Sequence, residues 1–266
     1  MTVVERKVEE EEGGYKMKVE TIEESDDKLV LVISKVTPGF VNAVRRSVIN
    51  EVPVLAIEKV FISKNSSAMY DEILAHRLGL IPLITPSGYS YDKRDAPANQ
   101  VRVTLKKQGP ATVYSGDLVF SDPEVKPVFD NIPIVELLNN QEVELEAVAI
   151  MGKGREHAKW SPGIAYHRNY PKIRINRNCK AAVDACPKGV YTFENGQLKA
   201  DPLKCEFIGN CVEACKGAIK VEPEKNKFIL TIESWGNMPA RKILDKAIDE
   251  VERIFNEFSN GLKSAK

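Results

Sequence analysis

The sequence contains no long apolar run. No stretch approaches the roughly 20 consecutive apolar residues that a membrane-spanning helix needs. Residues 1–14 also lack an apolar segment of the kind found in secretory signals. We therefore expect a cytoplasmic protein without a membrane anchor, in which clustered cysteines favour metal binding over structural disulfides.

An excess of charge is also absent, since 38 Lys and Arg residues balance 38 Asp and Glu residues. Contacts to phosphate dominate nucleic-acid affinity, so we expect no direct sequence-specific DNA binding by this chain.

Histidine is scarce too, with only three copies. His76 lies on a predicted helix beside Arg77, and nothing nearby supplies a nucleophile or an orienting acid. A structural or partner-facing role is expected for it rather than catalysis.

The chain of 266 residues, 43% of them hydrophobic, is long enough for two or three domains. Residues 1–14 end in four Glu and two Gly and predict a solvated acidic arm. Residues 15–22 and 28–34 alternate apolar and polar side chains, which predicts a β-hairpin.

A helix is predicted after this hairpin, with Thr37 as its N-cap, Pro38 at its first position and Pro53 as its stop. Its apolar face consists of Phe40, Val41, Val44 and Val48. Its polar face consists of Asn42, Arg45, Arg46 and Asn50. The two arginines are either solvated surface or groups that grip carboxylates or carbonyls of a partner through forked hydrogen bonds.

The middle of the sequence is predicted to be mainly β-structure. Strands are expected at residues 54–66, 101–106, 112–120, 142–150 and 172–175. A short helix within residues 68–83 should bury Ile73, Leu74 and Leu78 and end at Gly79. Loops are expected at residues 85–100, 121–134 and 152–171. Gly152-x-Gly154 is not a phosphate-binding fingerprint, because the third Gly and the following helix are missing.

All five cysteines lie between residues 179 and 215. Their spacing resembles the bacterial ferredoxin run C-x2-C-x2-C-x3-C-P, in which the fourth Cys of each run ligates the other cluster. In the second run the four ligand positions hold Cys205, Ile208, Cys211 and Cys215. In the first run they hold Asn176, Cys179, Ala182 and Cys186.

Sorting these positions by cluster leaves Cys186, Cys205 and Cys211 around one site, with Ile208 at the fourth position. Three thiolates favour a 3Fe–4S cluster, with a 4Fe–4S cluster as the alternative if its unique iron has another ligand or is labile. The other site keeps only Cys179 and Cys215, which would lie close enough for a disulfide. A zinc knuckle or a disulfide-stapled loop without metal stays open, although the spacing lacks the C-x2-C pairs of common zinc ribbons.

The C-terminal segment predicts an amphipathic helix of about twenty residues that starts at Met238-Pro239 and ends at Gly261. Its apolar stripe comprises Ile243, Leu244, Ala247, Ile248, Val251, Ile254, Phe255 and Phe258. The stripe is wider than the contact line between two helices of a coiled coil. It therefore either packs on a core alone or covers both a core and a partner helix.

Four motifs occur in a fixed order: TPGFVNAVRRSVINEVPVLAIEKV, DEILAHRLGLIPL, HAKWSP and the terminal helix. Together they closely resemble the D-subunit family of archaeal DNA-directed RNA polymerase. This family is similar to the amino-terminal domain of the bacterial α subunit and to the third-largest subunit of eukaryotic RNA polymerase II. The match covers nearly the whole chain. Some D subunits carry an iron–sulfur module, from which this copy departs at Ile208.

The resemblance implies an α+β fold in three parts. Residues 1–50 and 223–266 would form a discontinuous dimerisation domain of an antiparallel sheet and two helices. Residues 51–168 would form a β-rich inserted domain, and residues 169–222 a ferredoxin-like iron–sulfur domain.

The resemblance also implies a noncatalytic assembly subunit of RNA polymerase. It would form a heterodimer with subunit L and support assembly of the large catalytic subunits, with further small assembly subunits as neighbours. The residues expected at these partner surfaces are Asn42, Arg45, Arg46, His76, Arg77, Leu244, Ile248, Val251, Phe255 and Phe258. The chain shows no compact Asp triplet for catalytic Mg2+.

A rival interpretation is a ferredoxin-type electron-transfer protein fused to a carrier domain. A third interpretation is a redox sensor that uses the cluster to gate assembly, and it is compatible with the role of an assembly subunit.

Overall fold

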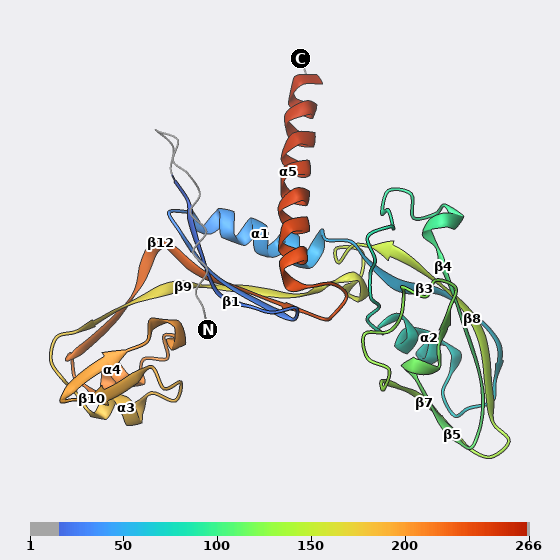
Figure 1. Ribbon diagram of the computed structural model, residues 1–266, viewed down its shortest axis with the longest axis horizontal. Helices are drawn as coiled ribbons and strands as arrows, with labels where there is room; N and C mark the ends of the chain where they lie inside the picture. Colours follow the sequence, from blue (N-terminus) through green and yellow to red (C-terminus); the bar gives the residue numbers. More distant parts are fainter. Residues whose placement is uncertain (1–15, 265–266) are drawn as a thin grey trace. The chain divides into compact units, whose positions relative to one another are not determined.

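The computed structural model describes residues 16–264 and has the α+β class expected from the sequence (Figure 1). By contacts the chain divides into two compact units. The first unit contains the described residues up to Ile22, together with Val30–Val41 and His167–Leu230. The second contains Glu23–Leu29, Asn42–Tyr166 and the described residues from Thr231 onward. The predicted acidic arm at residues 1–14 lies outside the described residues.

A four-stranded sheet has the strand order β1-β2-β12-β9. Its members are β1 (Lys18–Glu24), β2 (Lys28–Ser34), β12 (Ile219–Ser234) and β9 (Gly163–Ile175). The predicted hairpin is confirmed, because β1 and β2 are neighbours and the backbone N–H of Ser25 bonds to the carbonyl of Lys28 at 2.8 Å. Alternation of buried and accessible residues along the first half of β2 is the pattern that predicted it.

Helix α1 (Pro38–Asn50) begins where the sequence predicts. The backbone N–H of Phe40 donates to Thr37 Oγ1 at 3.3 Å, so Thr37 is the N-cap. Val41, Val44 and Val48 are buried, as expected from their helical spacing. Phe40 was predicted on the same face but is exposed. Phe40 lies in the first turn of the helix, before Val41, where the buried face of α1 begins.

Helix α2 (Asp71–Gly79) is also confirmed, and Gly79 is its last residue. Leu74 and Leu78 are buried one turn apart. Ile73, predicted beside them, is exposed. A helix places adjacent residues about 100° apart, and the buried strip here is too narrow to include both residues 73 and 74.

A second sheet has the order β3-β8-β4-β6, and its strands pair antiparallel. These are β3 (Val54–Asn65), β8 (Glu142–Gly152), β4 (Val101–Gln108) and β6 (Val119–Phe120). A separate pair joins β5 (Ala111–Tyr114) to β7 (Pro133–Leu137). The register sets Leu105 opposite Leu145 and Val103 opposite Ala147, and these side chains enter one apolar core with Leu74 and Leu78 of α2. The prediction of a mainly β middle section is confirmed. These strands bury alternate side chains, and this alternation is the sequence pattern that predicts a strand.

The single strand predicted at residues 112–120 was wrong. A 3-10 turn, Ser115–Asp117, divides it into β5 and β6, which pair with different strands. The Asp117 carboxylate accepts from the Tyr114 backbone N–H at 2.7 Å, and the Ile132 N–H donates to Ser115 Oγ at 3.1 Å. These side-chain bonds, one of them from Ile132 in the loop before β7, redirect the chain because Ser and Asp compete with the sheet for backbone groups.

Two predicted loops are shorter than expected. The predicted loop 121–134 gives way to β7 at Pro133, and proline is tolerated there because it is the first residue of the strand. The predicted loop 152–171 ends at Gly163, where β9 begins. A Cβ on Gly163 would stand 2.1 Å from the Glu233 carbonyl oxygen, so the close approach of β9 and β12 requires glycine.

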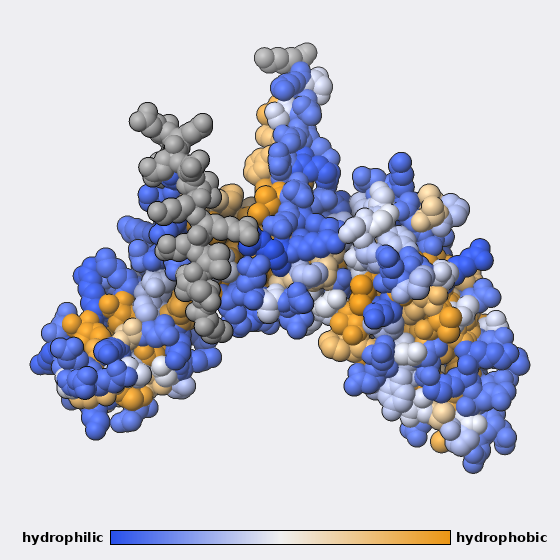
Figure 2. Space-filling model, viewed as in Figure 1, coloured by the Kyte–Doolittle hydropathy of each residue, from blue (hydrophilic) through white to orange (hydrophobic). Residues whose placement is uncertain are grey.

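Helix α5 (Ala240–Ser264) has 25 residues and is longer than predicted, since it continues through Gly261. Ile243, Leu244 and Ala247 in its first half are buried. Ser47 Oγ of α1 donates to the Ala247 carbonyl oxygen at 2.8 Å, which joins the two helices. Exposed apolar residues continue along the second half of α5, and Figure 2 shows hydrophobic side chains along one edge of it.

The cysteine-containing segment of the first unit has α3 (Ala181–Ala185), β10 (Tyr191–Glu194), β11 (Gln197–Ala200) and α4 (Asn210–Ala214). Strands β10 and β11 pair antiparallel across Asn195-Gly196. Both turn residues have positive φ, of 51° and 76°, which is typical of a type I′ hairpin turn. Cys205, Cys211 and Cys215 lie in a small core with Ala182 and Tyr191.

Candidate functional site

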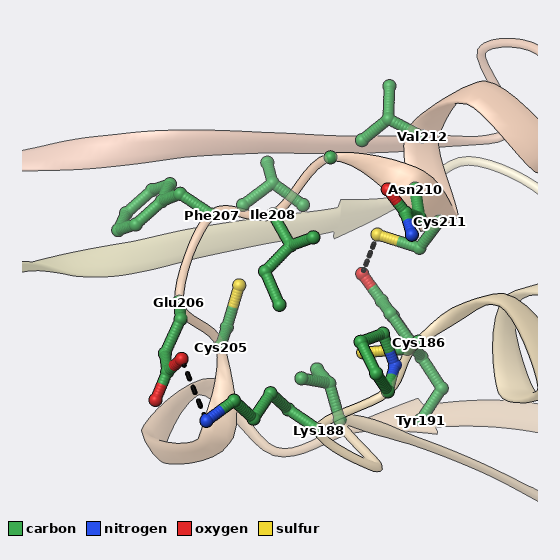
Figure 3. A pocket seen from close by; sticks show the side chains of 14 residues that line it. Cys186, Lys188, Tyr191, Cys205, Glu206, Phe207, Ile208, Asn210, Cys211 and Val212 are labelled. Carbon is green, nitrogen blue, oxygen red and sulfur yellow. Dashed lines mark hydrogen bonds and ion pairs between the residues drawn. The ribbon is translucent and has the colours of Figure 1, made fainter.

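Three free thiols, Cys186, Cys205 and Cys211, line one cavity of about 80 Å³ (Figure 3). Cys186 follows α3, Cys205 follows the 3-10 turn Pro202–Lys204, and Cys211 lies in α4. Cys205 and Cys211 are buried and Cys186 is half-buried. The fold therefore brings together the three cysteines that the spacing assigns to one site.

The loop between Cys205 and Cys211 has a left-handed backbone at two positions, Phe207 with φ 58° and Gly209 with φ 94°. This path turns the Phe207 backbone N–H towards the Cys205 thiol, to which it donates a hydrogen bond. Ile208, at the fourth ligand position, lines the same cavity and lies between Cys205 and Cys211 in Figure 3. A hydrocarbon side chain thus takes the place where a complete site would have a thiolate.

Arg168 of β9 supports the Cys205 loop. Its guanidinium donates hydrogen bonds to the backbone carbonyls of Cys205 and Leu203. Burial raises the pKa of the Cys205 thiol, and the neighbouring cysteines Cys211 and Cys186 act in the same direction. The Phe207 N–H and the Arg168 charge act against this rise. The hydrogen bond and the positive charge therefore offset part of the rise in the pKa of Cys205.

Among residues 16–264, no group of three His, Cys, Asp or Glu side chains is arranged so as to hold a metal ion. In an iron–sulfur cluster each thiolate binds a different iron, so its sulfurs are spread around a cavity rather than directed at a point. Three cysteine thiols around one cavity are a type of donor set that iron–sulfur clusters use.

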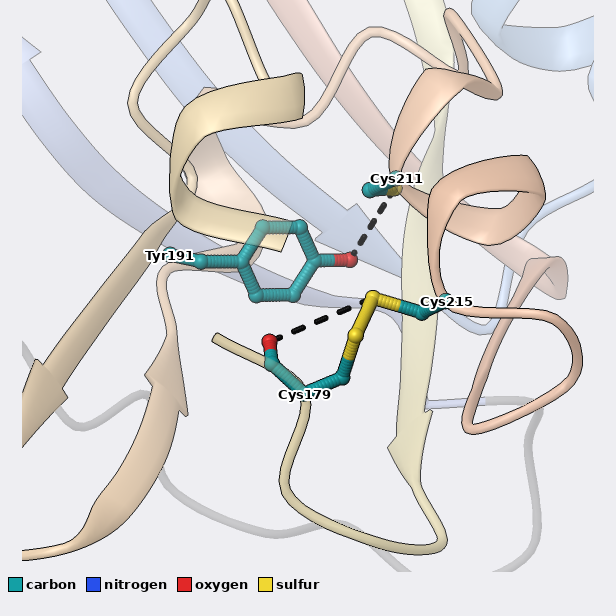
Figure 4. Close-up of a disulfide and its surroundings, with 4 residues drawn as sticks. All are labelled: Cys179, Tyr191, Cys211 and Cys215. Carbon is teal, nitrogen blue, oxygen red and sulfur yellow. Dashed lines mark hydrogen bonds between the residues drawn. A yellow bond between two sulfur atoms is a disulfide. The ribbon is translucent and has the colours of Figure 1, made fainter. Parts of the chain in front are cut away.

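Cys179 and Cys215 form a disulfide with an S–S distance of 2.08 Å and a Cα–Cα distance of 5.9 Å (Figure 4). Cys179 precedes α3 and Cys215 follows α4, so the bond links the ends of the two short helices. Since both sulfurs are used, the structure leaves only the thiols of Cys186, Cys205 and Cys211 available to a cluster.

The apolar stripe of α5 divides into two parts. Leu244 is buried in this chain and Val251 is half-buried. Ile248, Phe255 and Phe258 are exposed, and both phenylalanines have 65% of their surface accessible. Ile254 and Leu262 extend this exposed part, which we call the α5 stripe: Ile248, Val251, Ile254, Phe255, Phe258 and Leu262. Exposed aromatic side chains along one edge of a helix are typical of an association surface.

The polar residues predicted at partner surfaces have mixed surroundings. Arg45 donates through Nε and Nη2 to Asn42 Oδ1 at 3.1 Å and 3.0 Å, so these two half-buried residues bind each other. Arg77 donates to the Pro133 carbonyl at 2.6 Å. Arg46 and His76 are exposed. The last two are therefore the more accessible to a partner.

Lys153 is a functional candidate that sequence reasoning missed. Its side chain is only 2% exposed, and its Nζ lies 2.8 Å from Glu250 and 3.6 Å from Glu51. The ammonium also lies 4.7 Å from the centre of the Tyr91 ring. Lysine is almost never so fully buried without a partner.

Gly152 and Gly154, on either side of Lys153, are the sequence feature from which its burial could have been inferred. A Cβ on Gly152 would stand 2.1 Å from the Trp160 ring, and one on Gly154 would stand 2.0 Å from the Ile49 carbonyl oxygen. The glycines thus permit close packing on both sides of Lys153.

No helix in the described part of the chain is long and apolar enough to cross a membrane.

Comparison with known proteins gives concordant matches. A family model described as the RNA polymerase Rpb3/RpoA insert domain matches residues 57–163. The chain is 40% identical over 257 residues to DNA-directed RNA polymerase subunit Rpo3 of Pyrobaculum calidifontis, with 92% of this chain and 96% of the relative covered. The Rpo3 of Methanothermobacter thermautotrophicus is 42% identical over 243 residues, covering 85% and 92%. That of Pyrococcus horikoshii is 34% identical over 254 residues, covering 93% and 98%.

These matches and the α+β architecture define an RNA polymerase subunit of the Rpb3/RpoA class. Within that class, the chain belongs to the Rpo3 family of DNA-directed RNA polymerase, which is the D-subunit family. The resemblance found in the sequence motifs is confirmed.

Proposed function

We propose that this chain is a noncatalytic assembly subunit of an archaeal RNA polymerase, which pairs with subunit L and supports assembly of the large catalytic subunits. The α5 stripe carries the proposal. Its two phenylalanines are the most exposed residues of the stripe, and they continue the line of buried residues that anchors α5 to its own chain. Apolar area of this kind gains roughly 25 cal/mol per Å² when a partner covers it.

A helix-to-helix contact is the mode of pairing that this surface favours. The stripe has the i, i+3, i+4, i+7 spacing through which one helix packs into the grooves of another. The large subunits would then contact the exposed Arg46 and His76, whose side chains can reach carbonyls or carboxylates of a neighbour. The other small assembly subunits would join this platform.

We further propose that Cys186, Cys205 and Cys211 hold one iron–sulfur cluster, with 3Fe–4S favoured and 4Fe–4S as the alternative. When bound, the cluster would cross-link three segments of the cysteine-containing region and could add a redox-sensitive element. The Phe207 N–H and Arg168 would orient and stabilise the Cys205 thiolate.

Electron transfer as the main function is less favoured. A two-cluster ferredoxin needs two complete ligand sets. Here Cys179 and Cys215, which would serve the second cluster, are bonded to each other. A single site without its fourth cysteine fits a structural or sensing role better than a relay.

The test of the assembly function is co-purification with subunit L from cells that produce both chains. Phe255→Ala combined with Phe258→Ala should weaken pairing at least about 100-fold, because buried aromatic anchors dominate interfaces. Asn260→Ala is the matched control, since residue 260 is on the opposite side of α5 at 100° per residue. Equal recovery of subunit L with the double variant and with the control would rule out the α5 stripe as the interface.

A further inference from the structure

Tyr191, the first residue of β10, is a buried phenol whose hydroxyl meets a cysteine. Its side chain is 2% exposed, and its Oη lies 3.4 Å from Cys211 Sγ. A tyrosine hydroxyl removed from water generally has a hydrogen-bond partner. Figure 4 shows the hydroxyl directed at Cys211, with the Cys179–Cys215 disulfide below the ring in this view.

The direction of this hydrogen bond depends on the state of the thiol. With a free thiol, either sulfur or oxygen can donate. A cysteine that ligates iron has lost its proton, so only the tyrosine can then donate. The arrangement is thus suited to a thiolate at Cys211.

The ring is held firmly in place. Tyr191 belongs to the small core that also contains Ala182, Leu198 and Ile219. Its strand pairs with β11, where Tyr191 is opposite Ala200. Because both the backbone and the ring are fixed, the hydroxyl has little freedom to turn away from Cys211.

The other buried thiol receives a different donor. Cys205 accepts from the backbone N–H of Phe207, a group that no substitution except proline removes. Cys211 instead has a side-chain donor, which a single substitution can delete without altering the ligand. The cavity therefore offers one hydrogen bond to sulfur that can be tested separately.

We propose that Tyr191 is a positioning residue that donates a hydrogen bond to the Cys211 thiolate of the bound iron–sulfur cluster and thereby raises the reduction potential of the cluster. This inference rests on the proposed cluster at Cys186, Cys205 and Cys211. One added electron increases the negative charge on the sulfurs, so a donor stabilises the reduced form more than the oxidised form.

The experiment compares Tyr191→Phe with the wild type in full-length chain produced with subunit L under anaerobic conditions. The substitution removes one oxygen atom and keeps the ring. Tyr170→Phe is the control, because Tyr170 contacts Lys227 rather than a cysteine. Iron per chain is measured first, and the midpoint potential is then measured by a dithionite titration followed by EPR.

We expect Tyr191→Phe to retain its iron and to show a more negative potential. The equilibrium constant for one-electron reduction should fall by up to about tenfold, equivalent to ~59 mV. Tyr170→Phe should match the wild type in both iron content and potential.

Three results would overturn the inference, and they differ in what else they reject. Full iron with an unchanged potential in Tyr191→Phe would leave Tyr191 as a packing residue and leave the cluster in place. Loss of iron from a folded Tyr191→Phe chain would make Tyr191 a determinant of cluster retention instead of potential. Absence of iron from the wild type would reject the proposed cluster together with this role, and pairing through α5 would be unaffected.

Discussion

Lys153 Nζ lies 2.8 Å from Glu250 Oε2, although the two residues are 97 positions apart in the chain. Lys153 follows β8 and Glu250 lies in the middle of α5, where the buried half of the helix gives way to the α5 stripe. Glu51, which directly follows α1, faces the same ammonium at 3.6 Å. This ion pair therefore joins three segments of the second unit beside the proposed partner-binding surface.

Lys153→Met should destabilise the chain by about 3 kcal/mol, because removing one member of a buried ion pair leaves uncompensated charge behind. Glu51 and Glu250 would remain close together with only 15% and 18% of their side chains exposed. Methionine has a similar length, so little volume is lost. The free energy of unfolding, measured by urea denaturation, checks this expectation.

Lys220→Met is the control for that measurement. Lys220 pairs with Glu222 at 2.7 Å, but the lysine side chain is 59% exposed. Surface pairs of this kind contribute at most about 1 kcal/mol. Equal effects of the two substitutions would contradict a special role for the buried pair.

The same pair predicts a dependence of stability on pH. Burial alone would raise the pKa of Glu250, but hydrogen bonds from Lys153 and Arg253 outweigh it and hold this pKa below its usual value of 4.5. A carboxyl with a lower pKa in the folded chain stabilises that chain fully above its unfolded pKa. This stability is lost as the pH falls through the folded pKa.

We therefore expect the difference in unfolding free energy between the wild type and Glu250→Gln to be largest near about pH 7 and to shrink below about pH 4. Urea denaturation at several pH values gives this difference directly. A difference that stays constant with pH would show that Glu250 acts through packing and not through its charge.

Cysteine substitutions test the ligand assignment. Cys186→Ser, Cys205→Ser and Cys211→Ser should each remove most of the iron, because a three-thiolate site has no spare ligand. Cys179→Ser should leave the iron in place, since Cys179 is in the disulfide. Iron and sulfide analysis of anaerobically purified chain is the measurement. Full iron content in any of the first three variants would remove that residue from the ligand set.

Much of the fold follows from local patterns in the sequence. The Thr37 cap and the β2 alternation depend on neighbours within a few residues, so they could be predicted. The division of residues 112–120 into two strands could not, because it depends on contacts of Ser115 with the loop before β7. The start of β9 at Gly163 likewise depends on Glu233 of β12, which is far along the sequence.

The candidate site, like the fold, could be predicted from the sequence only in part. The cysteine spacing groups Cys186, Cys205 and Cys211 because iron–sulfur ligands follow a recognisable spacing rule. The groups that surround these ligands follow no such rule. Arg168 reaches Cys205 from β9, and Tyr191 reaches Cys211 from β10, through folding that brings distant segments together. Such contacts depend on the tertiary structure and cannot be predicted from the spacing of the cysteines.

Ile208→Cys provides the sharpest test of why the site is incomplete. Ile208 is at the position of the missing ligand, lines the cavity and is half exposed, so a thiol there has room to reach the fourth corner of a cluster. We expect the variant to gain iron, from about three to about four atoms per cluster, because a complete set of four thiolates holds a 4Fe–4S cluster. The EPR signal of an oxidised 3Fe–4S cluster should disappear, since the oxidised four-iron form is diamagnetic.

Ile208→Ser is the matched control, because serine is similar in size to cysteine but supplies no thiolate. This variant should keep the wild-type signal. Retention of the three-iron signal in Ile208→Cys would show that residue 208 does not face the open corner. A four-iron cluster already present in the anaerobic wild type would show that three thiolates suffice for it.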